Sequence, residues 1–293
     1  MIKHALLILI IIIFALNMGA SGIAPSFASL YGARLIKKRN AVFNFSLFVI
    51  LGAVLLGKGV SATLGKSLVA QQVLTADVVL VILGAATVGL FLANLLKIPQ
   101  STSQVTVASI AGAGLYFQQL NVKTVFFKIV PFWVILPALS FALTWLLYRI
   151  IYPPEHNNVH IYQTLFANEK KLKISALVAS CYVAFAIGTN NVGNAVGPLF
   201  GAGMVTIPAG LLVISPLFGL GAALLGAGTL ETAGKDIVPL GLFSSTLVSF
   251  VTATLLIVAS IMGIPQSLVQ LNLCSIFAIS CLKNGHHCTL GQH

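Results

Sequence analysis

Charged side chains are scarce in this sequence, and acidic ones are the scarcest. Only 7% of the 293 residues are charged and five are acidic, whereas 58% are hydrophobic and the mean hydropathy is +1.03. A soluble domain carries about 25% charged residues, because its surface must be hydrated. This composition excludes a soluble enzyme or a soluble binding domain and predicts an integral membrane protein.

CxxC motifs and histidines within the expected span cores are also lacking. None of the four cysteines belongs to a CxxC pair, and all six histidines lie outside the expected span cores. An enzyme acting inside the membrane needs a nucleophile with its base, or a metal set, so we expect no catalytic residue and no cofactor. Cys281, His286, His287 and Cys288 are metal-ligand types. Their irregular spacing favours an ordinary chain end, and we expect no metal.

The basic residues are not arranged as in a nucleic-acid-binding protein. The 16 Lys and Arg residues fall in short clusters between apolar runs, with no basic stripe interleaved with aromatic residues. Such clusters set the orientation of membrane proteins, because loops rich in Lys and Arg stay in the cytoplasm. The expected surroundings are therefore a lipid bilayer, and no nucleic-acid partner is expected.

Long apolar runs predict membrane-spanning helices. A helix needs about 20 apolar residues to cross the hydrocarbon core, whereas the strands of a barrel show short alternating segments. Apolar segments lie near 4–30, 41–57, 76–96, 101–119, 124–150, 174–199, 205–227, 237–262 and 266–282. The first resembles a secretory signal peptide, but a similar segment recurs deep in the chain and favours a structural helix.

An internal repeat is the most informative pattern in the chain. An offset of 169 residues superimposes identical residues, which are Gly19 on Gly188, Gly57 on Gly226, Gly65 on Gly234 and Lys66 on Lys235. An offset of 166 residues superimposes 98–101 on 264–267, and both read Ile-Pro-Gln-Ser. The chain therefore holds two copies of one unit.

The second copy is expected to enter the membrane from the opposite side, because five segments separate the two starts. This predicts an all-α polytopic bundle of two inverted-topology repeats with broken or re-entrant helices. We predict a first repeat at 1–150, a cytoplasmic connecting loop at 151–173 and a second repeat at 174–293. Basic clusters at 34–39 and 170–173 then share the cytoplasmic side, so the N-terminus lies outside the cell membrane.

The second repeat is expected to be C-terminally short. The counterpart of the first repeat's last span would lie near 290–315, whereas the sequence stops at His293. Two interpretations stay open: the last span is dispensable, or the chain is a truncated and inactive carrier.

Several stretches are unusually polar or glycine-rich for membrane depth, namely 19–25, 99–104, 188–194 and 265–267. Each alone is explained by helix packing, but breaks at matching places in two inverted repeats point to a transporter's binding site. The stretch after Pro99 predicts a helix that begins at membrane depth, and its free N–H groups, positive dipole end and hydroxyls suit an anion. Those hydroxyls belong to Ser101, Thr102 and Ser103, with Ser267 in the second copy.

Amides and one acid add further candidates. Asn190, Asn191 and Asn194 lie within five residues, and amides at membrane depth are costly unless they bind something. Glu231 is a rare acid near a span end and is a candidate coupling residue, although a surface i,i+4 pair with Lys235 explains it equally well.

The sequences GTNNVGNAVGP and GASGIAPSF and the paired IPQS blocks resemble the inorganic phosphate transporter (PiT) family over essentially the whole chain. The resemblance implies cotransport of phosphate with sodium or protons, through two inverted copies of a motif that contains Asn-Asp. It also implies which groups hold the anion: Ser101, Thr102, Ser103, Asn190, Ser267 and the backbone around Ser21 and Gly22, with Asn191 and Asn194 in the same motif.

The chain departs from that family where the two aspartates belong, since it has Ser21-Gly22 and Asn190-Asn191 instead. A carboxylate accepts the proton of monohydrogen phosphate, whereas sulfate has no proton to give and is disfavoured beside a carboxylate by on the order of a few kcal/mol. The chain also resembles the sulfate-permease branch of the family. Sulfate is therefore the favoured substrate, and phosphate is the alternative.

The absence of the two aspartates also indicates which ion is coupled to transport. Sodium prefers carboxylate oxygens, so a proton is the better interpretation and sodium the weaker one. An anion channel uses hydroxyls and backbone dipoles too, but it would pass current without coupling to a gradient. A homodimer is compatible with the sequence.

Overall fold

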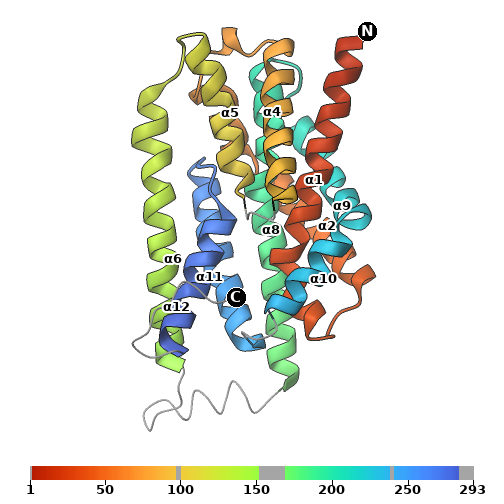
Figure 1. Cartoon of the computed structure of the whole chain (residues 1–293), viewed down its shortest axis with the longest axis vertical. Helices are drawn as coiled ribbons and strands as arrows, with labels where there is room; N and C mark the ends of the chain where they lie inside the picture. Colours follow the sequence, from red (N-terminus) through yellow and green to blue (C-terminus); the bar gives the residue numbers. More distant parts are fainter. Residues whose placement is uncertain (1, 97–99, 152–168, 238–240, 284–293) are drawn as a thin grey trace.

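The fold is built from helices, most of them long enough to cross a bilayer. The structure is a computed structural model that describes residues 2–96, 100–151, 169–237 and 241–283 (Figure 1). Within these residues no sheet is present, and seven helices have the length and apolarity that a membrane span requires. The prediction of an all-α, multi-pass membrane protein is confirmed.

The helices fall into two similar series along the chain. The first series is α1 (Ile2–Gly32), α2 (Lys38–Leu56), α3 (Lys58–Ala62), α4 (Ala76–Leu95), α5 (Thr102–Tyr116) and α6 (Val130–Ile151). The second series is α8 (Glu169–Gly201), α9 (Ile207–Leu224), α10 (Gly226–Ile237), α11 (Leu242–Ile261) and α12 (Leu268–Lys283).

Some helices extend into segments that the sequence predicts as loops. Helix α8 begins at Glu169, inside the predicted connecting loop at 151–173, and the division of the chain into two repeats stays a prediction. Glu169 favours a helix start, since its charge complements the helix dipole, and Lys173 one turn later contacts it at 3.1 Å. The short helices α3 and α10 were not predicted, because their glycines and charged residues are typical of loops.

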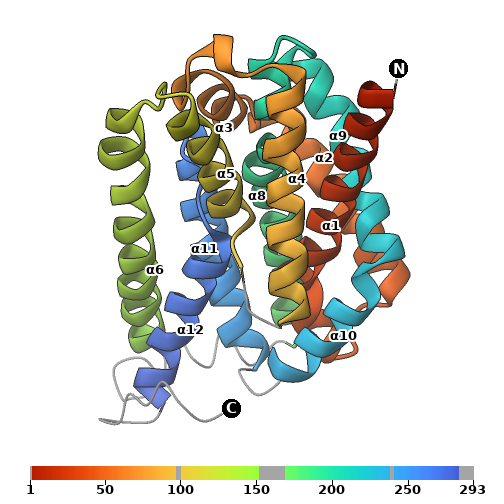
Figure 2. The same ribbon diagram turned by 45° about the horizontal axis from the view of Figure 1, so that its top comes forward.

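Two helical hairpins enter the bundle from opposite ends. The α4–α5 hairpin enters at the end where the N-terminus lies, and the α11–α12 hairpin enters at the other end (Figure 1). The inner ends of both hairpins lie away from the two ends of the bundle, so α5 and α12 begin in its interior (Figure 1). Helix α6 stands on the side away from α1 and packs against α11 and α12 (Figure 2).

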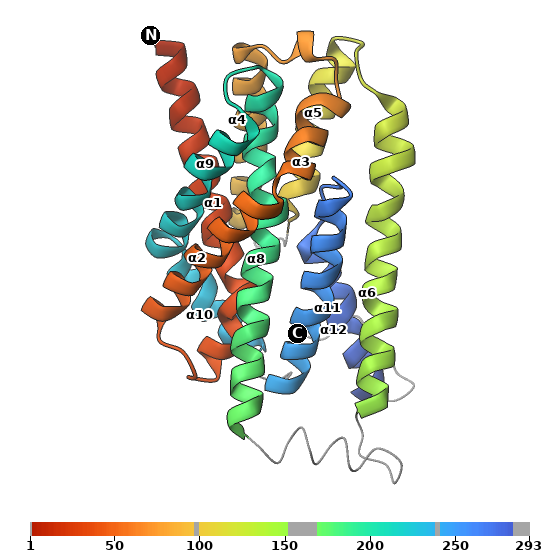
Figure 3. The ribbon, with the colours of Figure 1, turned by 180° about the vertical axis from the view of Figure 1, so that it is seen from behind.

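The long helices α1 and α8 run in opposite directions and pack against the other series. Helix α1 packs against α9 and α10, whereas α8 packs against α2 and α3 (Figure 3). A methyl group on Gly19 would overlap the carbonyl oxygen of Phe218, and a methyl group on Gly188 would overlap that of Val49. These two contacts are the same contact shifted by 169 residues, as related halves would produce. The inversion relative to a membrane stays a prediction.

Candidate functional site

The tips of the two hairpins are helix starts capped by serine. The Gln104 backbone N–H donates to Ser101 Oγ at 3.2 Å, and the Gln270 backbone N–H donates to Ser267 Oγ at 3.2 Å. A cap of this kind fixes the first turn and leaves the other N–H groups of that turn available for a ligand. Pro99, the predicted helix-start residue, lies outside the described residues.

Asn190 ties both tips to the centre of α8. Its Nδ2 donates to Ser260 Oγ at 2.9 Å and to the Ile264 carbonyl at 3.1 Å. Its Oδ1 accepts from the Gln266 backbone N–H at 3.1 Å and from Ser103 Oγ at 3.2 Å. The side chain is fully buried, and all four of its hydrogen-bonding positions are used within the protein. In this structure Asn190 positions the hairpins and has no group left for a ligand.

Ser103 and Asn194 extend this network rather than lining an open space. Ser103 Oγ accepts from Asn194 Nδ2 at 3.1 Å while donating to Asn190. On the other side of the second hairpin, the Trp133 indole N–H of α6 donates to the Pro265 carbonyl at 2.8 Å. Helix α8 therefore holds the first tip, and α8 and α6 together hold the second.

A small cavity lies between the tips and the centres of α1 and α8. Its volume is about 80 Å³, far below the roughly 300–1,000 Å³ of sites for organic ligands. Its lining consists of Ser21, Gly22, Pro25, Gln100, Ser101, Thr102, Ile187, Asn191, Leu268, Val269 and Asn272. The size suits a small inorganic ion.

Five of the predicted binding residues line this cavity and four do not. The lining residues are Ser21, Gly22, Ser101, Thr102 and Asn191. The other four, Ser103, Asn190, Asn194 and Ser267, make the hydrogen bonds that hold the tips. Asn272 was missed in the sequence analysis, since its only signal was an amide in a mostly apolar stretch, five residues after Ser267.

The cavity contains polar groups but no ionisable ones. Among the described residues, none of those that line it is acidic or a histidine. The start of α5 contributes a positive dipole end. Around the tips, buried amide oxygens lack a hydrogen-bond partner within the described protein; they belong to Gln100, Asn191, Asn194, Gln266 and Gln270. In folded proteins, buried polar atoms of this kind are satisfied by an ordered water or a bound ion.

A second cavity of about 40 Å³ lies next to the first, and Pro25 and Asn272 line both. Three serines line it, Ser29 of α1 and Ser245 and Ser249 of α11. Because Ser29 lies near the end of α1 and Ser245 near the start of α11, this second cavity lies on the side of the tips that faces that end of the bundle.

Glu231 is not part of either cavity. It lines a separate surface cavity of about 670 Å³ with Tyr31, Arg34 and Lys37, near the end of α1. In the part of the chain that the structure describes, no cluster of three His, Cys, Asp or Glu residues could hold a metal. His286, His287 and Cys288 lie outside that part.

Comparison with known proteins agrees with this geometry. Residues 18–292 match the Phosphate transporter family. A sulfate permease of Bacillus subtilis (CysP) is 38% identical over 279 residues, which cover 95% of this chain and 77% of that protein. A putative phosphate permease of Thermococcus kodakarensis is 24% identical over 344 residues, covering 89% and 85%. A solved structure, "The sodium-dependent phosphate transporter", matches with a TM-score of 0.82 at 25% identity, covering 96% and 90%.

Proposed function

This chain belongs to the phosphate transporter family, and from that premise we propose that it is a secondary active transporter that favours sulfate over phosphate. The family makes it an inorganic anion transporter. The named relatives are permeases and transporters, and we propose no enzymatic activity.

The observation that carries the proposal is a small cavity with hydroxyls, amides and a helix start but no carboxylate. Ser101, Thr102 and Asn191 can all donate hydrogen bonds to an oxyanion, and the α5 start adds N–H groups. An amide can turn its NH₂ toward sulfate, whereas a carboxylate can only repel it. The sulfate permease among the relatives supports the same preference.

The proposed mechanism is alternating access. The two series of helices would rock against each other around the tips, and the serine-lined second cavity would give the anion its way to one side. In the proposed orientation the N-terminus lies outside the cell membrane, so this exit faces the cytoplasm, where the basic clusters at 34–39 and 170–173 lie.

We propose proton coupling, because none of the described residues that line the cavity has a carboxylate that could coordinate sodium. Since Glu231 lies outside the cavity, it would act in coupling only from a distance.

Sodium-coupled phosphate transport is the second candidate, and one observation favours it. Two of the unpaired amide oxygens, those of Gln100 and Asn191, belong to residues that line the cavity and are hard ligands for a sodium ion. The name of the solved structural relative, a sodium-dependent phosphate transporter, points the same way.

The test is uptake of radiolabelled sulfate into proteoliposomes under an imposed pH gradient or an imposed sodium gradient, with excess unlabelled phosphate as competitor. We expect uptake that follows the pH gradient and is insensitive to phosphate. Phosphate uptake that follows sodium would establish the second candidate instead. Sulfate current without any dependence on the cation gradients, recorded across a planar bilayer, would identify a channel.

A further inference from the structure

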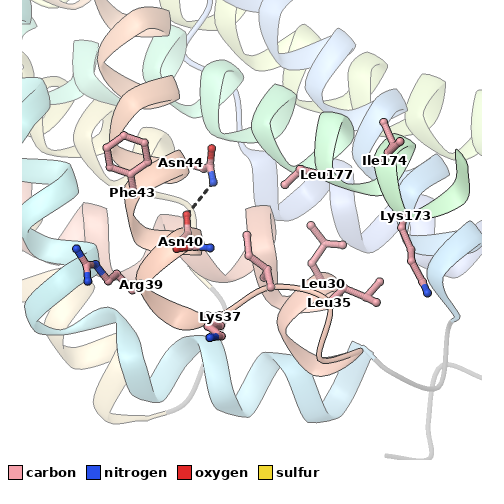
Figure 4. Close-up of a pocket in the computed structure, with 11 residues that line it drawn as sticks. Leu30, Leu35, Lys37, Arg39, Asn40, Phe43, Asn44, Lys173, Ile174 and Leu177 are labelled. Carbon is pink, nitrogen blue, oxygen red and sulfur yellow. Dashed lines mark hydrogen bonds between the residues drawn. The ribbon is translucent and has the colours of Figure 1, made fainter. Parts of the chain in front are cut away.

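A large surface cavity lies at the end of the bundle where α1 ends and α8 begins (Figure 4). Its volume is about 900 Å³. The α1–α2 connection and the first turns of α2 form one wall, and the first turns of α8 form the other. The cavity therefore joins an element of the first series to an element of the second.

The rim of this cavity is basic. Lys37 and Arg39 stand on one side and Lys173 on the other (Figure 4). Among the described residues that line it, none is acidic. The acid nearest in sequence, Glu169, forms an exposed pair with Lys173 at 3.1 Å, and exposed pairs of this kind are weak. The rim is thus suited to a negatively charged group.

The wall of the cavity is apolar and uncovered. Phe43 is 66% exposed and Ile174 62% exposed, and Leu35 and Leu177 are exposed as well. Both α2 and α8 have the length and composition of membrane spans, so their outward apolar residues meet lipid chains. A basic rim above an apolar wall at a membrane boundary is the arrangement that holds a lipid phosphate.

We propose that this cavity binds the headgroup of an anionic phospholipid, with its acyl chains along Phe43 and Ile174. The lipid is favoured over a free inorganic oxyanion because the cavity is about 900 Å³, more than ten times the 80 Å³ of the site between the hairpin tips. The exposed apolar wall can contact the hydrocarbon chains of a lipid, whereas it offers nothing to a free inorganic anion. This inference does not depend on which anion is transported.

Native mass spectrometry of the purified protein tests the proposal, with phosphatidylglycerol and phosphatidylcholine of identical chains as probes. The test variant is Lys37→Gln with Arg39→Gln. The matched control, Lys123→Gln with Lys128→Gln, removes two exposed charges that do not line the cavity. We expect the test variant to bind phosphatidylglycerol roughly 30-fold more weakly, and the control to bind like the unchanged protein. Phosphatidylcholine binding should change in neither.

Two results would overturn the proposal. One is equal loss of phosphatidylglycerol in test and control variants, since that would reflect overall charge. The other is displacement of the lipid by millimolar inorganic phosphate or glycerol 3-phosphate, since that would identify a site for free anions. Lys173→Gln, on the opposite wall, provides an independent variant, and normal elution in detergent shows that each variant is folded.

Discussion

The centres of α1 and α8 correspond under the 169-residue offset, yet their polar side chains make different hydrogen bonds. Ser21 donates only to its own helix, to the Met18 carbonyl at 3.1 Å, and it is exposed. Its counterpart Asn190 is fully buried and makes four hydrogen bonds to the two hairpins. The two halves thus pack alike, but their helix centres make different contacts: Asn190 of α8 hydrogen-bonds to both hairpin tips, whereas Ser21 of α1 borders the small cavity.

The largest effect on folding is expected from the two glycines that pack in the same way in both halves. Gly19→Val and Gly188→Val each place a branched side chain against the backbone of a helix in the other series. Because backbone moves less readily than a side chain, we expect each to cost more than about 3 kcal/mol and to abolish recovery of monodisperse protein. The measurement is the yield after size-exclusion chromatography.

The matched control is Gly112→Val, since Gly112 has open space around it. Equal yields for all three variants would contradict the reciprocal packing. Loss from only one of the two core glycines would show that the halves are less equivalent than the structure indicates.

The second largest effect on stability is expected from replacing Asn190, in comparison with replacing Asn191. Asn190→Leu leaves the Gln266 N–H and the Ile264 carbonyl without this partner in a buried position. Leaving buried groups unpaired costs about 1–3 kcal/mol each, so we expect a clear fall in the thermal unfolding midpoint together with loss of transport. Asn191→Leu should keep the midpoint nearer that of the unchanged protein, because no described hydrogen bond depends on its Oδ1. Equal destabilisation would show that Asn190 has no special tying role.

Sequence reasoning found the polar stretches but not this division between neighbouring residues. Adjacent residues on a helix point about 100° apart, so one amide can face the hairpins and the next the cavity. The partners of Asn190 lie about 70 to 90 residues away in the chain, and a sequence without aligned relatives does not reveal such pairs.

The fold was more predictable than the site for a physical reason. Span length and helix breaks are local properties that hydropathy and glycine or proline positions report directly. The location of Glu231 could not be predicted in this way. The sequence shows that an acidic residue is rare here, but the position of Glu231 in a surface cavity beside Arg34 depends on how α10 packs against the end of α1.

Introducing a carboxylate at Asn191 tests whether this cavity residue selects between sulfate and phosphate. Asn191→Asp places a negative charge beside the proposed anion, and we expect sulfate uptake to fall about fivefold or more, from a cost of about 1–3 kcal/mol. Phosphate uptake in the same vesicles is the internal control and should fall less, because monohydrogen phosphate can donate its proton to the carboxylate. Equal loss of both anions would show that Asn191 does not select between them.

The smallest effect is expected on the α1 side. Ser21→Ala removes a hydroxyl whose hydrogen bond goes to its own helix, so the half-saturating sulfate concentration should change less than about twofold. Thr102→Val, at the start of α5 in the same cavity, removes a hydroxyl that can donate to the anion and should raise that concentration about fivefold. Both are measured as uptake against sulfate concentration at equal reconstituted protein. If Ser21→Ala has the larger effect, α1 binds the ion directly, and the two helix centres are chemically more alike than their hydrogen bonds indicate.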